Sequence, residues 1–292
     1  MKNVVTRFAP SPTGRLHLGH AYSALLAHRF ARDRGGSFLL RIEDIDRNRA
    51  RAAFVDGIIG DLLWLGIELD GEIVYQSERL PLYAEALDRL SERGLVYPCF
   101  CTRSAIAAEI AASVAAPHGP DGPVYRGRCR VLSEDERAQR RRTEPHAWRL
   151  DMVAALDSLP AGASLRWFDE GREIPADPLA FGDVVLARKD APTSYHLAVT
   201  VDDAAQDVSD VVRGRDLFAA THVHRLLQAL LGLPTPQYHH HALLTDAEGR
   251  RLAKRNGAPT LAELRANGAD PHGLTDDLLA GRLPAGYLAA RS

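Results

Sequence analysis

Two histidines, His17 and His20, stand where a short apolar run and its turn lead into a helical pattern. Imidazole N–H groups can donate hydrogen bonds to phosphate oxygens, and Gly19 between them lets a nucleotide approach the backbone. The N-terminus of the expected helix adds a partial positive charge that favours an anion. The pattern therefore indicates a site for nucleotide phosphates. The alternative is a pair of surface histidines beside a helix start.

The only cysteines of the chain are Cys99, Cys101 and Cys129. An odd, clustered set in a chain without a signal-peptide pattern argues against a disulfide framework and favours metal ligation. Three thiolates suit Zn²⁺, and His118 is a candidate fourth ligand on chemical grounds. Three buried, metal-free cysteines are the alternative.

Residues 239–241 are three consecutive histidines and invite a second metal hypothesis. Consecutive strand residues point to opposite faces, so only His239 and His241 could converge on one ion. We favour a strand that borders the active site.

These residues need elements that position them, and the first hundred residues alternate strand and helix patterns. Apolar runs at 4–8 and 37–42 predict strands, and helical spacing predicts helices over about 18–36 and 52–65. Strand, helix, strand, helix with short links is typical of α/β folds with a parallel sheet. The glycine-rich fingerprint of dinucleotide-binding folds is absent after the first strand, which leaves a generic NAD-binding function without support.

The chain changes character after about residue 98. Residues 107–124 predict a loop or mobile link. A strand at 195–201 is expected to resume the core, followed by a helix at 221–231, a strand at 238–244 and short C-terminal helices. We expect four segments: 1–97 as the first half of a core, 98–189 as an inserted subdomain, 190–245 as the second half of the core, and 246–292 as a loop with C-terminal helices.

The formal net charge is −2, so the whole molecule has no general affinity for nucleic acids. Positive charge gathers between Arg126 and Arg142, where a solvated helical face is the alternative to a nucleic-acid surface. No apolar run approaches the roughly 20 residues that span a bilayer, and the N-terminus lacks the apolar core of a signal peptide. We expect a cytoplasmic protein that is not bound to a membrane and acts as a monomer.

Residues 7–20, which read RFAPSPTGRLHLGH, resemble the first signature of the glutamyl-type class I aminoacyl-tRNA synthetases. The run RIEDID at 41–46 resembles the second block of this family, and the runs at 195–203 and 211–214 extend the likeness. The run RLAKR at 251–255 stands where the family's KMSKS loop belongs. These five blocks imply an α/β fold, with a Rossmann-type parallel-sheet core, an inserted zinc-containing subdomain and a short helical C-terminal part.

The resemblance implies amino-acid activation, in which a carboxylate joins the α-phosphate of ATP and pyrophosphate leaves. The barrier lies mainly in bringing anions together and stabilising charge, so no protein nucleophile is needed. Mg²⁺ is expected to accompany the ATP phosphates. Arg251 and Ala253 replace the usual Lys and Ser of the loop, which leaves room for slower activation and does not imply loss of function. The catalytic and ATP-binding residues implied are His17, Gly19, His20 and, against the departing pyrophosphate, Lys254.

Glutamate would bring two carboxylates and one ammonium. Arg7 and Arg213 are forked cationic donors suited to carboxylates, and Glu43 can pair with the ammonium. The alternatives are a capping or ion-pairing role for Glu43 and an ion pair of Arg213 with Asp210 or Asp216. The glutamate pocket that the resemblance implies consists of Arg7, Phe8, Ala9, Pro10, Ser11, Glu43, Tyr195 and Arg213.

The spacing of Cys-x-Cys and Tyr-x-x-x-Cys resembles the zinc site of the glutamyl-Q tRNA(Asp) synthetase family. Only 37 residues follow Arg255, too few for a helical anticodon-binding domain. The family likeness implies activation of L-glutamate with ATP and without tRNA, then transfer to the queuosine base in the anticodon of tRNA(Asp). The arginine-rich stretch is then a candidate surface for RNA phosphates. The zinc ligands implied are Cys99, Cys101, Tyr125 and Cys129.

Three other functions stay open from the sequence. A truncated glutamyl-tRNA synthetase that charges tRNA(Glu) is the nearest. A small-molecule nucleotidyltransferase shares the histidine motif, but it leaves the glutamate blocks unexplained. A non-catalytic RNA-binding relative has Ala253 as its only support.

Overall fold

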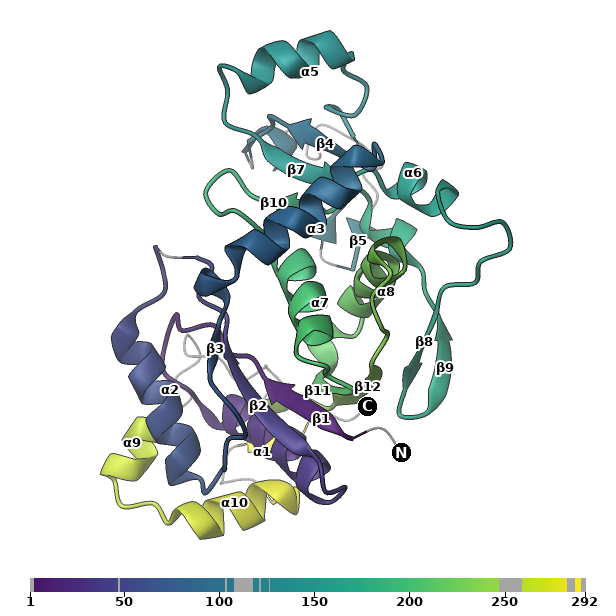
Figure 1. Ribbon diagram of the computed structural model, residues 1–292. Coiled ribbons are helices and arrows are strands. Elements are labelled where there is room, and N and C mark those ends of the chain that lie inside the picture. Colours follow the sequence, from purple (N-terminus) through teal and green to yellow (C-terminus); the bar gives the residue numbers. More distant parts are fainter. Residues whose placement is uncertain are drawn as a thin grey trace.

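The computed structural model describes residues 3–46, 48–102, 104–107, 118–120, 122–125, 127–246, 259–282 and 287–289. The chain is an α/β protein, as the sequence predicts (Figure 1). Its helices are α1 (Leu18–Arg32), α2 (Ala52–Trp64), α3 (Leu80–Glu92), α5 (Glu134–Arg141), α6 (Met152–Asp157), α7 (Tyr195–Ala205), α8 (Ala220–Leu231), α9 (Leu261–Ala266) and α10 (Pro271–Leu279). Its strands are β1 (Val5–Phe8), β2 (Ser37–Ile42), β3 (Val74–Tyr75), β4 (Val96–Cys99), β5 (His118–Gly119), β6 (Gly122–Pro123), β7 (Ala147–Leu150), β8 (Arg166–Asp169), β9 (Arg172–Pro175), β10 (Val185–Ala187), β11 (Asp210–Gly214), β12 (Gln237–His241), β13 (Leu244–Asp246) and β14 (Tyr287–Ala289).

Parallel strands form the centre of the molecule, which confirms the predicted parallel sheet. Strand β1 pairs with β2 and β2 with β3, and separately β11 pairs with β12, all in parallel. Ser209 joins the two sets, because it exchanges hydrogen bonds with the backbone of Val5 at 2.8 and 3.0 Å. Residues from distant parts of the chain therefore end beside one another at the same sheet edge.

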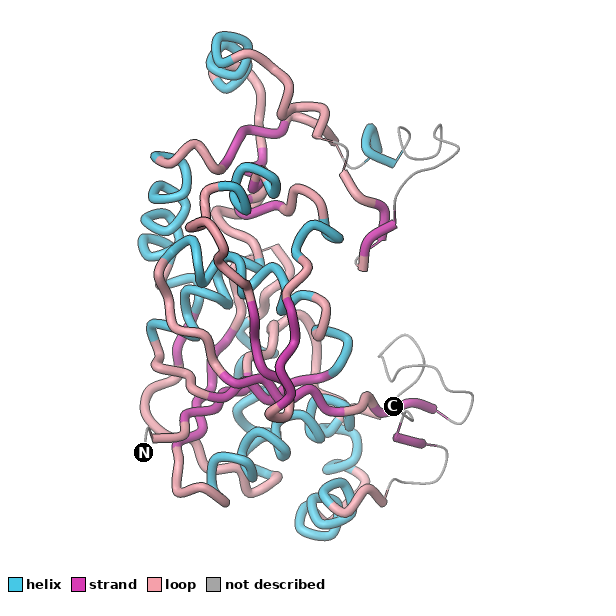
Figure 2. Tube along the Cα trace, turned by 90° about the vertical axis from the view of Figure 1, so that its right-hand side faces the viewer, coloured by secondary structure: helices cyan, strands magenta, loops and turns pink. Residues whose placement is uncertain are grey.

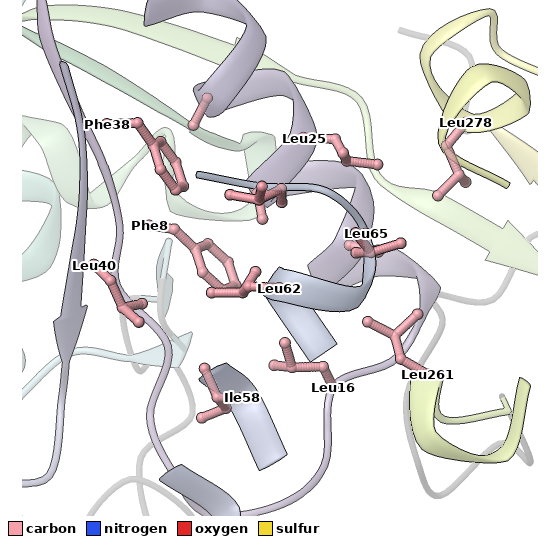
Figure 3. Close-up of a cluster of buried hydrophobic side chains, with 14 of the residues drawn as sticks. Phe8, Leu16, Leu25, Phe38, Leu40, Ile58, Leu62, Leu65, Leu261 and Leu278 are labelled. Atoms are coloured by element: carbon pink, nitrogen blue, oxygen red, sulfur yellow. The ribbon is translucent and has the colours of Figure 1, made fainter. Parts of the chain in front are cut away.

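One buried apolar cluster holds α1 and α2 against β1 and β2. Phe8, Phe38 and Leu62 lie at its centre, and Leu261 of α9 and Leu278 of α10 pack against it (Figure 3). The two C-terminal helices therefore belong to the same packed body as the first strands. Leu261 N donates to the carbonyl of Leu16 at 2.9 Å, which anchors α9 beside the loop before α1.

A second apolar cluster gathers α3, α7 and α8 beneath the antiparallel strands β4, β7 and β10. The side view of Figure 2 shows the resulting elongated body. Strands β8 and β9, from within the predicted insertion 98–189, form an antiparallel pair, and β8 pairs in parallel with β12. The predicted division into four segments stays a prediction.

One predicted element is wrong in type. Residues 195–201 were expected as a strand and form the first part of helix α7. Each residue from Leu197 to Asp203 is buried, so this helix lacks the polar face that gives an amphipathic pattern. A short, continuous apolar run does not distinguish a buried strand from a buried helix.

Most other predicted elements are confirmed. The helix predicted over 18–36 ends at Arg32, and the strand predicted over 238–244 is divided between β12 and β13. The predicted loop 107–124 lies largely outside the described residues, which here include the short pair β5 and β6. Among the described residues no helix is long and apolar enough to cross a membrane.

Candidate active site

A cavity of about 980 Å³ opens where β1, the start of α1, α7 and β11 meet. Every described residue that the sequence assigns to ATP or glutamate lines it. Lys254, Arg251 and Ala253 lie outside the described residues. The predicted residues on the cavity wall are Arg7, Phe8, Ala9, Pro10, Ser11, His17, Gly19, His20, Glu43, Tyr195 and Arg213.

The histidine pair is built into the start of α1. His17 is the N-cap residue, and its Nδ1 accepts a hydrogen bond from Gly19 N at 3.1 Å, while His20 Nδ1 accepts from His17 N at 3.2 Å. A neutral ring that accepts at Nδ1 carries its proton on Nε2 and can donate there. A Cβ atom on Gly19 would lie 3.0 Å from Cε1 of His17, so glycine also makes room for the capping imidazole.

Arg7 is only 5% exposed, and a carboxylate from a distant helix holds it. Its Nε and Nη2 donate to the two oxygens of Asp203 at 3.0 and 3.2 Å. The fully buried Arg41 donates from Nη2 to the same carboxylate at 2.8 Å. Burial would raise the pKa of Asp203, but the charges of Arg7 and Arg41 outweigh it and hold that pKa below its ordinary value.

Glu43 lines the cavity beside these guanidinium groups. Burial raises the pKa of its carboxyl to about 7, although the positive charges of Arg41 and Arg7 act in the opposite direction. Arg41 Nη2 lies 3.8 Å from Glu43 Oε1, a long ion pair. The Glu43 carboxyl is therefore placed to gain from a further cation that enters the cavity, such as an ammonium group.

Arg213 of β11 is held by hydrogen bonds to neutral partners. Its Nε donates to His240 Nε2 at 3.1 Å, and its Nη1 lies 3.3 Å from the Tyr195 hydroxyl. His240 Nδ1 lies 2.8 Å from Asp169 Oδ1. Burial, then the charge of Arg213, lowers the pKa of His240 to about 2, so its ring is neutral and can accept from the guanidinium. Asp210 pairs with His239 instead of Arg213.

The histidines of β12 divide as alternation requires, which supports a strand that borders the cavity. His241 lines the cavity and lies 3.1 Å from Ser23 Oγ. His239 also faces α1, with the ring of Phe30 against it and Asp210 at 2.9 Å, whereas His240 faces Arg213 and Asp169. Sequence reasoning missed the roles of His240, Arg41 and Asp203. For His240 the signal was its place between the other two, because strand alternation turns it to the opposite face.

The cysteine cluster lies on β4 and the turn that follows Tyr125. All three Sγ atoms lie within 4.8 Å of one another, and Cys101 Sγ is 3.6 Å from Cys129 Sγ. The Tyr125 hydroxyl lies 3.5 Å from Cys99 Sγ and 3.6 Å from Cys101 Sγ. Among the described residues this is the only group of three or more His, Cys, Asp or Glu that could hold a metal ion. The side chain of His118 lies outside the described residues.

The arginine-rich stretch covers the cysteine cluster. Helix α5 starts at the capping box of Ser133 and Glu136. Arg140 pairs with Glu144 at 2.7 Å and stacks over the ring of Phe100, whereas Arg128, Arg141 and Arg142 are exposed. Some arginines are therefore structural, and others remain accessible to a partner.

A parallel α/β core, a histidine pair at its first strand–helix junction and a cavity of guanidinium and carboxyl groups define a class I aminoacyl-tRNA-synthetase catalytic domain. In agreement, the family model for the class I tRNA synthetases (E and Q), catalytic domain, matches residues 3–279. The chain is 52% identical to the glutamyl-Q tRNA(Asp) synthetase of Rhodobacter capsulatus, over 92% of this chain and 97% of the relative. It is 46% identical to that of Nocardia farcinica, over 93% of this chain and 84% of the relative.

The solved structures agree with the sequence relatives. The glutamate-tRNA synthetase of Elizabethkingia anophelis superposes with a TM-score of 0.79 and 28% identity, over 97% of this chain. This chain spans 63% of that longer protein. The chain belongs to the glutamyl-Q tRNA(Asp) synthetase family and is a ligase-type enzyme.

Proposed function

We propose that this enzyme activates L-glutamate with ATP, without tRNA, and transfers the glutamyl group to the queuosine base in the anticodon of tRNA(Asp). One observation carries the activation step: Arg7, Glu43 and Arg213 line the same cavity as His17 and His20. Groups that suit an acidic amino acid therefore share one space with groups that suit nucleotide phosphates. The relatives in Rhodobacter capsulatus and Nocardia farcinica are named glutamyl-Q tRNA(Asp) synthetases, and this name supports tRNA(Asp) as the acceptor.

In activation, an α-carboxylate oxygen of glutamate forms a bond to the α-phosphorus of ATP, and the bond to the leaving pyrophosphate breaks. The enzyme's contribution is to hold anions together and stabilise their charge. His17 and His20 would donate to phosphate oxygens, and Lys254 would neutralise the pyrophosphate. Mg²⁺ would accompany ATP and add charge neutralisation at its phosphates.

We assign Zn²⁺ to Cys99, Cys101, Cys129 and the Tyr125 hydroxyl. A tetrahedral ion with Zn–S bonds of about 2.3 Å separates its ligand atoms by roughly 3.8 Å. The Sγ atoms of Cys101 and Cys129 are 3.6 Å apart, close to that spacing, and all three Sγ atoms lie within 4.8 Å of one another, with the Tyr125 hydroxyl 3.5 and 3.6 Å from Cys99 and Cys101. Such an ion would stabilise the small subdomain without taking part in activation.

The exposed arginines Arg128, Arg141 and Arg142 form the proposed contact with RNA phosphates. Arg141 is the last residue of α5 and Arg142 is its C-cap, whereas Arg128 lies in the turn before Cys129; α5 stands at one end of the molecule in Figure 1. Arginine contacts to phosphates position a nucleic acid without reading its sequence. The base would then be selected by groups at the cavity.

The first test measures ATP–pyrophosphate exchange with glutamate, glutamine and aspartate in the absence of RNA. Exchange with glutamate alone is expected. The second test follows labelled glutamate onto tRNA(Asp) with and without queuosine, and transfer is expected only to the modified tRNA. Exchange that requires tRNA, transfer that ignores the modified base, or glutamate esterified to the 3′ end of tRNA(Glu) would contradict the proposal.

A further inference from the structure

Two adjacent carboxylates near the end of α7 face different parts of the molecule. Asp202 accepts hydrogen bonds from Gln76 Nε2 at 2.7 Å, Arg79 Nε at 2.7 Å and the Tyr83 hydroxyl at 2.8 Å. These partners lie on η1 (Gln76–Glu78) and at the start of α3, and none of them lines the cavity. Asp203 accepts instead from Arg7 and Arg41.

Asp203 takes one edge of the Arg7 guanidinium and leaves the other. A guanidinium offers two edges with paired N–H groups, one through Nε and one through both Nη atoms. Asp203 takes the Nε edge through Nε and Nη2. Within the described part of the chain, Arg7 Nη1 has no hydrogen-bond partner, and Arg7 lines the cavity. The edge formed by the two Nη atoms is thus the one available to a carboxylate ligand.

Arg41 holds the Asp203 carboxylate in place through a second ion pair. Its Nη2 donates to Asp203 at 2.8 Å, and its Nη1 donates to Gln206 Oε1 at 2.9 Å. Arg7 and Arg41 lie on neighbouring parallel strands, β1 and β2. The carboxylate is therefore held by two rigid strands, and it cannot rotate without losing a hydrogen bond to a buried charge. It also offsets the charge of an Arg7 side chain that is nearly removed from water.

We propose that Asp203 is a positioning residue for amino-acid recognition: it acts through Arg7 and aims the free guanidinium edge at a carboxylate of the substrate. Asp203 itself does not line the cavity, so it does not contact the substrate. This inference rests on the proposed activation of glutamate. Asp202 has the same charge and a similar burial, but its hydrogen bonds tie α7 to α3, and its contact with Arg41 is a longer ion pair of 3.7 Å between Oδ2 and Nε.

The test compares Asp203→Asn with Asp202→Asn in the full-length enzyme by glutamate-dependent pyrophosphate exchange. Asp203→Asn removes the negative charge and places an amide N–H against an N–H of Arg7. The Arg7 guanidinium is therefore expected to rotate away from its position in the wild type. The KM for glutamate is expected to rise about tenfold to 100-fold, with kcat and the KM for ATP changed less than about threefold. Asp202→Asn is expected to lower the melting temperature and to leave the glutamate KM within about twofold.

Equal glutamate KM values in the two variants would overturn the inference while leaving the proposed function intact. Absence of exchange in the wild-type enzyme would overturn the proposed function and this inference with it. If Asp203→Asn does not fold, Asp203→Glu takes its place. That variant keeps the charge but advances the carboxylate by one methylene, and it is expected to raise the glutamate KM severalfold. An unchanged KM there would also overturn the inference.

Discussion

The cavity and the cysteine cluster differ in the charges that they bring together. In the cavity, Arg7 is buried beside Asp203, and Arg213 is buried beside a neutral His240, so the positive groups are held in place before any ligand arrives. In the cluster, three thiols and a phenol approach one another, and burial raises the pKa of Tyr125 and of Cys101, the latter to about 11. In the described part of the first site the cations are therefore held in place without a ligand, whereas the second site gathers donors that a cation would hold together.

The difference predicts which changes affect chemistry and which affect stability. A preorganised cavity gains rate from fixed charges, so its variants should lose activation with little change in folding. A cluster of metal ligands contributes folding free energy through the bound ion, so its variants should lose stability first. The following predictions test this separation.

The largest effect is expected for Lys254→Ala. Loss of the cation that neutralises pyrophosphate should reduce exchange by about 100-fold to 1000-fold with an unchanged melting temperature. The chain has only three lysines, and Lys189, which donates to the carbonyl of Phe100 at 2.7 Å beside the cluster, supplies the control. Lys189→Ala should keep exchange within about twofold. Normal exchange in folded Lys254→Ala would show that Lys254 does not neutralise the departing pyrophosphate.

Arg213→Lys should have the next largest effect. Lysine keeps the charge, but one ammonium cannot replace the planar fork that bonds to His240, Tyr195 and Thr221. The glutamate KM is expected to rise by about tenfold to 100-fold. Arg225→Lys on α8, which loses a bond to the carbonyl of Arg166 away from the cavity, is the matched control. Similar KM values for the two variants would show that the charge alone matters at position 213.

A pH dependence follows from Glu43. Its raised pKa of about 7 means that the carboxyl is neutral below and ionised above that pH. Because only the ionised form attracts the substrate ammonium, kcat/KM for glutamate should fall as pH decreases below about 7, by up to about tenfold per pH unit. Glu43→Gln should lower kcat/KM and abolish this slope. If this pH dependence of kcat/KM persists in Glu43→Gln, it arises from the titration of another group.

The raised pKa also has a stability consequence of the opposite sign. The folded protein disfavours the ionised carboxyl, because burial raises its pKa from 4.5 to about 7. The free energy of unfolding that this shift contributes is therefore fully present below about pH 4.5 and is lost as the pH rises from about 4.5 to 7. Glu43→Gln is therefore expected to melt at the same temperature as the wild type or higher at pH 8.

The smallest effect on activation is expected for Cys101→Ser. Loss of one ligand should abolish the expected one zinc per chain, measured by emission spectrometry, and lower the melting temperature by about 5 °C or more. Pyrophosphate exchange should stay within about twofold. Chelator-treated wild type should behave alike and recover with Zn²⁺. A large loss of exchange in the folded variant would contradict this separation, because it would show that the cysteine cluster affects activation in the cavity.

The sequence by itself determined most of the local elements and named eleven of the residues on the cavity wall. Strand β1, its turn, helix α1 and strand β2 follow from short-range patterns, since apolar spacing and turn residues act within a few positions. All eight residues predicted for glutamate line the cavity, because the motifs that name them end at neighbouring strand and helix ends. Their contact with glutamate stays a prediction.

Only the tertiary structure decided how those residues are held. Asp203 and Arg7 lie 196 positions apart, and the Asp203 carboxylate near the end of α7 reaches Arg7 of β1 and Arg41 of β2 only in the folded chain. Packing of α7 against α3 and α8 explains the wrong prediction for 195–201, since residues 197–203 of this helix are all buried and give no periodic polar face. Local patterns record which face of an element meets water. They do not record which distant charge will lie opposite a buried side chain, and that choice sets the geometry of this site.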